Sequence, residues 1–163
     1  MDILVYRAKR RDKEAFSSLI RQHTSSMYKV AKAILKNDDD VADAIQESVL
    51  ACWEKIDTLK KDQYFKTWLT RILINNCNAI CRQRGRMASD DALIESGIVE
   101  QSYAAVEWQE FLQCLDEKYR IVIMLYYIEG FKIREIAEIL ELNENTVSTR
   151  LAKARKIMEK QYL

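Results

Sequence analysis

The residues best suited to chemistry lie near the C-terminus, between positions 132 and 156. Short hydrogen-bonding side chains come first there and basic side chains follow, and helical spacing puts them on one outer face: Asn145, Thr146, Ser148, Thr149, Arg150, Lys153, Arg155 and Lys156. The short side chains suit base edges in the DNA major groove, and the basic ones suit the flanking phosphates. This pattern predicts a surface that binds duplex DNA, and an ordinary helical hairpin is the alternative.

A second polar set lies in the first half of the chain. A stripe at intervals of four, three and four residues is expected opposite Trp68 and Leu69: Arg71, Asn75, Asn78 and Arg82. Asparagine is a mediocre helix former, so the stripe favours nucleic-acid contact over scaffolding. The residues before it combine positive charge, polar groups and rings: Lys60, Lys61, Asp62, Gln63, Tyr64 and Phe65. These suit an unstacked base, since rings stack and lysines hold the backbone. A basic surface helix with core aromatics is the alternative.

Charge is segregated along the chain although its net value is only +1. Residues 37–54 carry six acids and no base, residues 55–86 carry eight bases and two acids, and residues 87–117 carry eight acids and no base. Blocks of this size suggest one face for a polyanion and another for a basic protein partner. The alternative is a patchy, solvated helical surface.

Three helices must position these groups in the first half. Residues 12–36 have one apolar face, and Asn37 with the three aspartates after it ends this helix and offers an N-cap for the next. The second helix has an inner stripe of Val41, Ala44, Ile45, Ser48, Val49, Cys52, Trp53 and Ile56, and a polar side of Asp40, Asp43, Gln46, Glu47 and Glu54. The third has an inner face of Phe65, Trp68, Leu69, Ile72, Leu73, Asn76, Ala79 and Ile80.

Gly85 and a loss of periodicity mark a boundary, and the acidic residues 86–103 are predicted to be a linker with at most a short helix. Helical periodicity returns at Val106 and continues to the end, with breaks near 129–130 and 141–143. The apolar run 121–128 could be a strand by composition, but the helical spacing of residues 107–120 favours a buried helix.

The last two helices form a predicted helix-turn-helix. Inner stripes of Ile133, Ile136, Ala137 and Leu140 and of Val147, Leu151, Ala154 and Met158 flank a tight turn. Leu142 fills this turn, Asn143 or Asn145 can cap the second helix, and the small Ala137 lets the two helices cross closely. Glu141 stands where a glycine is common in such turns.

Composition further narrows the structural class of the protein. Proline is absent and only 3 glycines occur, which favours long helices and short loops. The longest apolar run is far short of the roughly 20 residues that span a bilayer, and the first turns are charged rather than signal-like. His23 is isolated, and the thiols of Cys52, Cys77, Cys81 and Cys114 are expected to be reduced and mostly buried. We therefore expect a cytoplasmic all-α protein with no catalytic residues, cofactor or metal, built of two small helical domains joined by a flexible acidic linker.

Three stretches together resemble an extracytoplasmic-function (ECF) sigma factor, a small two-domain subunit that directs bacterial RNA polymerase to promoters. They are ADAIQE at 42–47 with Trp53 downstream, FKTWLTRI at 65–72 with Asn75, and IREIA at 133–137 leading to TVSTRLAKAR at 146–155. Their order and separation match as well. The resemblance implies an N-terminal domain over 1–86, a linker over 87–104 and a C-terminal domain over 105–163.

The resemblance also assigns partners. It implies that Asp39, Asp40, Asp43, Gln46, Glu47 and Trp53 dock on the clamp helices of the largest polymerase subunit. The segment from Lys60 to Phe65, with the polar stripe after it, would bind and melt the −10 element, and the outer face at residues 145–156 would bind the duplex −35 element. The acidic linker would thread polymerase channels otherwise used by RNA. An anti-sigma factor, often membrane-anchored, would hold the protein inactive.

One further departure from the family pattern and two alternative functions remain. Ser148 stands where many relatives have a basic residue, so −35 binding would rest more on Arg150, Lys153 and Arg155. A conventional helix-turn-helix regulator would use only the C-terminal domain, as a dimer on a palindrome, and never bind polymerase. A sigma-like adaptor would bind an anti-sigma factor without initiating transcription, and should lack the −10 site.

Overall fold

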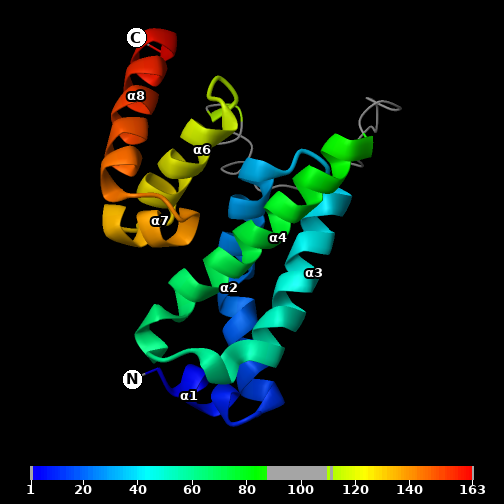
Figure 1. Ribbon diagram of the computed structural model, residues 1–163. Coiled ribbons are helices and arrows are strands. Elements are labelled where there is room, and N and C mark those ends of the chain that lie inside the picture. The colour runs from blue at the N-terminus through cyan, green and yellow to red at the C-terminus, as the bar shows by residue number, and fades with distance from the viewer. Residues whose placement is uncertain (1, 88–109, 111, 163) are drawn as a thin grey trace. The chain divides into compact units, whose positions relative to one another are not determined.

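The computed structural model describes residues 2–87, 110 and 112–162, and it divides the chain into two compact units, residues 1–95 and 96–163. Every regular element in the described ranges is helical, which confirms the predicted all-α class (Figure 1). The predicted linker over 87–104 and the return of periodicity at Val106 lie, Met87 apart, outside the described residues.

The first unit is a bundle of three long helices closed at one end by a short one. Its elements are α1 (Ile3–Lys9), α2 (Lys13–Ile34), α3 (Asp38–Lys55), the 3-10 turns η1 (Ile56–Thr58) and η2 (Asp62–Tyr64), and α4 (Phe65–Met87). Helices α2, α3 and α4 pack against one another, and α1 lies at the end of the bundle where α3 ends (Figure 1). The sequence did not predict α1.

Side-chain caps set the first residues of these helices. The Asp12 carboxylate accepts from the backbone N–H groups of Glu14 and Ala15 at 3.1 and 3.2 Å. The Asn37 side chain accepts from the backbone N–H of Asp39 at 2.7 Å, which confirms the predicted cap of the second long helix. Because each cap satisfies N–H groups that have no partner inside the helix, it determines locally where the helix begins.

The buried face of α4 differs from the predicted one. Phe65, Leu69 and Leu73 are buried as predicted, whereas the predicted inner residues Trp68, Ile72, Asn76 and Ile80 are half-buried and Ala79 is exposed. Buried instead are Thr67, Thr70, Ile74 and Cys77. Helix α4 packs against both α2 and α3, so its buried arc is wide and extends to a side that a single apolar stripe does not reveal.

The core between α3 and α4 contains a hydroxyl group, an amide and two thiols. Ser48 donates to the carbonyl oxygen of Ala44 at 2.6 Å and accepts from the amide of Asn76 at 3.0 Å. Cys52 and Cys77 are buried, whereas Cys81 and Cys114 are half-buried, so the expectation of mostly buried thiols holds for the first two. Burial raises the pKa of Cys52 to about 12, which leaves it a protonated and inert core residue.

The second unit comprises α6 (Glu117–Ile123), the π-helical turn η3 (Met124–Ile128), α7 (Ile133–Leu140) and α8 (Glu144–Tyr162). Helix α8 packs against α6 and α7. The apolar run 121–128 is helical and largely buried, which confirms the prediction of a helix over a strand. The helix predicted from the spacing of residues 107–120 was wrong at one place. Residues 113–116 form a turn, and α6 begins only after Asp116.

The predicted helix-turn-helix is present in α7 and α8. Glu141 ends α7 in the left-handed conformation, at φ 56° and ψ 45°, and the N–H of Leu142 donates to the carbonyl of Ala137 at 2.9 Å. Asn143 rather than Asn145 is the cap, since its side-chain oxygen accepts from the N–H of Thr146 at 2.7 Å. This turn is the αL-type helix end that usually carries glycine.

Glu141→Gly should stabilise the protein because it removes a left-handed non-glycine residue. That conformation costs an L-residue about 1–2 kcal/mol, part of which is offset by the greater freedom of glycine in the unfolded chain. We expect the free energy of unfolding of the second unit to rise by up to about 1 kcal/mol in urea titrations. The control Glu138→Gly, in the exposed middle of α7, should lower it by about 1 kcal/mol. A lower stability for Glu141→Gly would contradict this account of the turn.

Candidate nucleic-acid and protein interfaces

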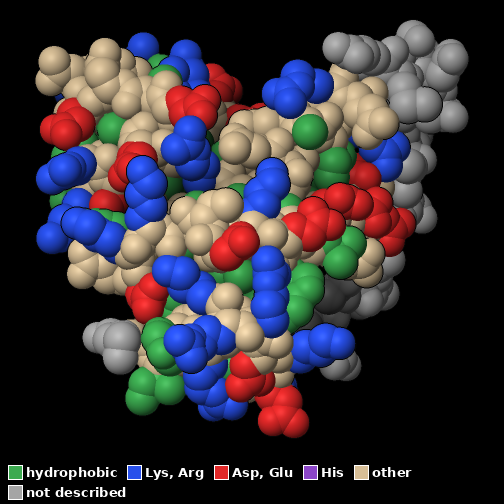
Figure 2. Space-filling model, turned by 60° about the horizontal axis from the view of Figure 1, so that its bottom comes forward, with side chains coloured by type: hydrophobic (Ala, Val, Ile, Leu, Met, Phe, Trp, Pro, Cys, Tyr) green, Lys and Arg blue, Asp and Glu red, His purple; other side chains and the backbone are tan. Residues whose placement is uncertain are grey.

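An acidic face runs along the outside of α3. Its members are exposed and follow one side of the helix: Asp39, Asp43, Gln46, Glu47, Leu50 and Glu54. The steps from Asp43 to Gln46, Leu50 and Glu54 are three, four and four residues, which keeps these side chains aligned. Acidic side chains gather with hydrophobic ones beside them at the right of Figure 2, on the side of the bundle where α3 lies. Such a strip suits a basic helical partner.

Leu50 is a member of this face that the sequence pattern did not predict. Its side chain is 59% exposed in the middle of the acidic face. The available signal was its position, because Leu50 is a large apolar residue that falls outside the inner stripe of the same helix. An exposed leucine between carboxylates supplies the apolar contact that a purely charged face lacks.

The structure places the Asp40 carboxylate against α4 rather than on the acidic face, so its predicted position on the polar side was wrong. Asp40 is 8% exposed, and its carboxylate accepts from Arg84 of α4 through Nη2 at 2.8 Å and Nε at 3.1 Å. The Asp40 carboxylate raises the pKa of the Arg84 guanidinium. Because both carboxylate oxygens are occupied by α4, Asp40 joins two helices of the bundle.

Trp53 also makes contacts within the bundle. Its half-buried ring packs on Phe16 of α2 with ring centroids 5.0 Å apart, and the Arg11 guanidinium lies 5.2 Å above it. Arg11 donates to the backbone carbonyls of Trp53 and Glu54 at the end of α3. The aromatic ring is therefore part of the junction between the α1–α2 turn and α3.

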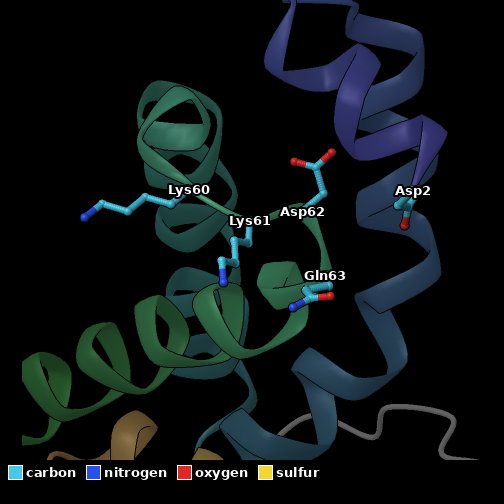
Figure 3. Close-up of a pocket in the computed structure, with 5 residues that line it drawn as sticks. All are labelled: Asp2, Lys60, Lys61, Asp62 and Gln63. Carbon is cyan, nitrogen blue, oxygen red and sulfur yellow. The ribbon is translucent and has the colours of Figure 1, made fainter.

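The segment before α4 borders a hollow. Residues 60–64 run between η1 and α4 and are here called the base-reading loop, after the role predicted for them from the sequence. The hollow of about 500 Å³ is lined by Asp2, Lys60, Lys61, Asp62 and Gln63 (Figure 3). Figure 3 shows the Asp62 carboxylate turned toward α1, away from the side chains of Lys61 and Gln63. Lys9 of α1 binds this carboxylate at 3.2 Å. The loop is thus tied to α1 and presents its cations and amide outward.

The rings of this segment divide between surface and core. Tyr64 is 48% exposed, with the Lys61 ammonium 6.0 Å above its ring. Phe65 is 3% exposed and packs against His23 and Trp68 with centroids at 5.2 and 6.0 Å. Of the two predicted stacking rings, Tyr64 alone is open to a ligand, and Phe65 anchors the start of α4.

The polar stripe of α4 lies on its solvent side. Asn75 and Arg82 are exposed, and Arg71 and Asn78 are half-buried. Trp68 was expected opposite this stripe, but it is half-buried on the same side as Asn75. The two residues are seven positions apart, which is close to two full helical turns. The stripe therefore joins an indole ring, two amides and two guanidinium groups along one side of α4.

The predicted duplex-binding residues of α8 all lie at the surface. Asn145, Ser148, Thr149, Lys153, Arg155 and Lys156 are exposed, and Thr146 and Arg150 are half-buried. Two hydroxyl protons are already used, since Thr146 donates to the Asn143 side chain at 2.9 Å and Thr149 donates to the carbonyl of Asn145 at 2.8 Å. These hydroxyl oxygens can still accept hydrogen bonds. Asn145, Thr149 and Lys156 lie on the side of α8 opposite its buried residues and are here called the outer line.

Two of the cations of α8 are held by tyrosines. Arg155 Nε donates to the Tyr127 hydroxyl at 2.6 Å, and the guanidinium lies 5.9 Å from the Tyr126 ring centroid. The Lys153 ammonium lies 5.8 Å from the Tyr119 ring, and its hydrogen bond lowers the pKa of the Tyr119 hydroxyl. Rings from α6 and η3 thus orient cations that the sequence assigned to phosphate binding alone.

Other kinds of site find no support in the part of the chain that the structure describes. No cluster of three or more histidine, cysteine or carboxylate side chains there could hold a metal ion. No helix in these ranges is long and apolar enough to cross a membrane. The surfaces that remain are one acidic face and two polar, basic ones.

Comparisons with known proteins match both halves of the chain to one family. The family sigma-70 region 2 matches residues 19–87, and sigma-70 region 4 matches residues 105–158. The chain is 33% identical to RNA polymerase sigma factor SigV of Bacillus subtilis over 153 residues, which cover 92% of each protein. It is 27% identical to the ECF RNA polymerase sigma factor SigW of the same organism, with 96% of this chain and 94% of SigW covered.

Two solved structures share the fold. The structure of CnrH in complex with the cytosolic domain of CnrY has a TM-score of 0.74 and 26% identity, and covers 98% of this chain and 94% of CnrH. The sigma factor RpoE of Bartonella quintana, in complex with the anti-sigma factor NepR, has a TM-score of 0.76 over 89% of this chain and 94% of RpoE. At 24% identity the second likeness concerns the fold alone.

Proposed function

The chain belongs to the sigma-70 family, as an extracytoplasmic-function sigma factor, and from that premise we propose how its surfaces direct bacterial RNA polymerase core enzyme to promoters. One observation carries the proposal: a single chain presents an exposed acidic face on α3, a lysine-bearing loop beside a polar stripe on α4, and a helix-turn-helix. A conventional helix-turn-helix regulator needs only the last of these.

The acidic face docks on the core enzyme. The clamp helices of the largest polymerase subunit are the basic partner that the charge pattern fits, and Asp43, Glu47 and Glu54 supply the complementary charge. Leu50, at the centre of the strip, supplies buried apolar area once the partner covers it. Asp40 and Trp53 support this face from within the bundle and do not belong to it.

The base-reading loop and the α4 stripe bind the melted −10 element. The hollow beside Lys60, Lys61 and Gln63 accepts one unpaired base, and the exposed Tyr64 ring stacks on a neighbouring base. Asn75 offers a donor and an acceptor to a base edge, and Arg71 and Arg82 bind the strand's phosphates. Binding unpaired bases here stabilises the open promoter over the duplex.

The outer line of α8 binds the −35 element as duplex. Asn145 and Thr149 face the base edges, and Lys156, Lys153, Arg150 and Arg155 bind phosphates on either side. Because Tyr119 and Tyr127 already hold two of these cations, less side-chain entropy is lost when DNA binds. Ser148 is exposed and short, so specificity at its position comes from a water or from Thr149.

An anti-sigma factor is the expected regulator. Support comes from two similar structures, that of CnrH in complex with the cytosolic domain of CnrY and that of the sigma factor RpoE in complex with the anti-sigma factor NepR. An inhibitor that covers the acidic face or the helix-turn-helix would block polymerase or promoter binding. We place the protein in the cytoplasm, where core polymerase and DNA are found.

The proposal is tested by run-off transcription with purified bacterial core enzyme. Core enzyme with this protein should initiate from a cognate promoter selected from a genomic fragment pool, and core enzyme alone should not. A pull-down with core enzyme measures docking separately. Absence of core binding would refute the proposal, and a stable dimer on a palindromic site would establish a conventional regulator instead.

A further inference from the structure

The outer surface of α1 takes no part in the function proposed above, yet it exposes two large apolar side chains. Ile3 is 66% exposed and Tyr6 is 42% exposed, and both belong to a helix of 7 residues. Among the described residues only Leu50, Tyr64 and Tyr127 share this property, and each of these lies on or beside a surface already assigned a partner. The exposure on α1 therefore needs its own explanation.

One side of α1 faces the base-reading loop. Asp2, Tyr6 and Lys9 are separated by four and three residues, so they lie on the same side of the helix. Asp2 lines the hollow, and Lys9 binds Asp62 of the loop at 3.2 Å. Tyr6 lies between these two contacts along that side of the helix, next to the residues that line and bind the loop.

The chemistry around Tyr6 is that of a nucleic-acid site. The Arg10 guanidinium lies 4.9 Å from the Tyr6 ring centroid, and Arg10 enters no ion pair with any residue that the structure describes. The two nearby acids are used internally, since Asp2 accepts from the N–H of Leu4 at 3.0 Å and Asp12 accepts from Arg7 at 2.6 Å. Lys and Arg side chains predominate over the lower part of Figure 2, which looks toward this end of the bundle.

We propose that Tyr6 and Arg10 form a second stacking site for the unpaired promoter strand, adjoining the hollow at the base-reading loop. One base stacks on the Tyr6 ring next to the base held in the hollow, and Arg10 binds the phosphate beside it. An aromatic ring with an adjacent cation is the combination that binds single-stranded DNA regardless of sequence. The inference rests on the proposed function of residues 60–64, and it extends the single-strand path from the loop onto α1.

The test uses the complete protein assembled with core polymerase. Single-stranded oligonucleotides of the −10 region carry the fluorescent base 2-aminopurine at one position at a time, so quenching reports which base stacks on the protein. Tyr6→Ala should weaken oligonucleotide binding roughly 5- to 150-fold, the range for one lost stacked base. It should also restore fluorescence at a single position, on the other side of the hollow-bound base from the position affected by Tyr64→Ala.

Two variants separate stacking from simple burial of apolar surface. Tyr6→Phe retains the ring and should bind the oligonucleotide within about twofold of the unsubstituted protein, since stacking does not need the hydroxyl. Ile3→Ala removes the other exposed side chain of the same helix and should leave binding and quenching unchanged. Thermal unfolding of each variant confirms that an exposed substitution leaves the bundle intact.

Three results would overturn the proposal. Unchanged oligonucleotide binding by Tyr6→Ala, with a clear loss for Tyr64→Ala, would remove the α1 site and leave the base-reading loop in place. Weaker assembly of Tyr6→Ala with core enzyme would identify a protein-docking surface instead. Unchanged oligonucleotide binding by Tyr6→Ala and by Tyr64→Ala would refute the single-strand function of the loop itself, on which the α1 site depends.

Discussion

Reversing two charges on the acidic face, with Asp43→Lys and Glu47→Lys together, should abolish binding to core polymerase while the helices remain folded. Both side chains are exposed on α3, so the change alters the surface without opening the core. Each substitution converts an attraction to a basic partner into a repulsion, and like charges across an interface cost several kcal/mol. We expect the affinity for core enzyme to fall at least about 100-fold.

The measurement is the affinity for fluorescently labelled core enzyme, with circular dichroism as the check on folding. The double variant Glu14→Lys with Glu138→Lys changes the net charge equally at exposed positions off the acidic face, and it should bind core enzyme normally. Leu50→Ala should weaken binding by a smaller factor because it removes apolar contact without adding repulsion. If the matched control loses affinity as strongly as the reversal, net charge and not the acidic face governs docking.

A substitution of Asp40 tests whether this residue stabilises the bundle or contacts the polymerase. Asp40→Ala should lower the unfolding temperature of the bundle, because Arg84 loses the carboxylate that joins α4 to α3. If the Asp40→Ala protein kept its unfolding temperature but lost affinity for core enzyme, Asp40 would itself belong to the docking interface.

The second large effect is expected on promoter opening. Arg71→Ala and Asn75→Ala combined should leave core binding unchanged and reduce the open complex by roughly 10- to 1,000-fold, since a well-placed base contact contributes about 1–3 kcal/mol and a phosphate contact adds to it. The loss arises at opening because these groups lie on the α4 stripe that we assign to unpaired bases. Permanganate reactivity of thymines in the −10 region reports the opening directly.

The control for this variant is Gln83→Ala, an exposed change on the same helix outside the stripe. It should open the promoter normally. Loss of core binding by the stripe variant would mean that the docking and DNA faces overlap, and unimpaired opening would remove the stripe from the −10 site.

Local features of the chain were predictable from the sequence. Asn37 as one of four candidate caps of α3, Asn143 as one of two candidate caps of α8, and the break at Glu141 follow from residues that satisfy or interrupt backbone hydrogen bonds within a few positions. The buried stripe of Val147, Leu151 and Ala154 follows from helical spacing alone. Such signals need no knowledge of what lies across the core.

Other features depended on packing between distant segments. The rotation of α4 that buries Ile74 and leaves Trp68 half-exposed follows from its two packing partners, since a single stripe does not report a second contact. Helix α1 was not predicted because its 7 residues are too few to show a period, and its Asp2 cap and its packing on α2 stabilise it instead.

By itself, the sequence determined the helical class, the caps, the helix-turn-helix and the separation of acidic from basic surfaces. The tertiary structure alone decided which polar groups are available to partners. Asp40 is taken by Arg84, 44 positions away, and Asp62 is taken by Lys9, 53 positions away. Leu50 and Tyr6 are left exposed. The physical reason is range: a helix is stabilised by hydrogen bonds between near neighbours, whereas the partner of a charge or a ring is whatever segment the folded chain places beside it.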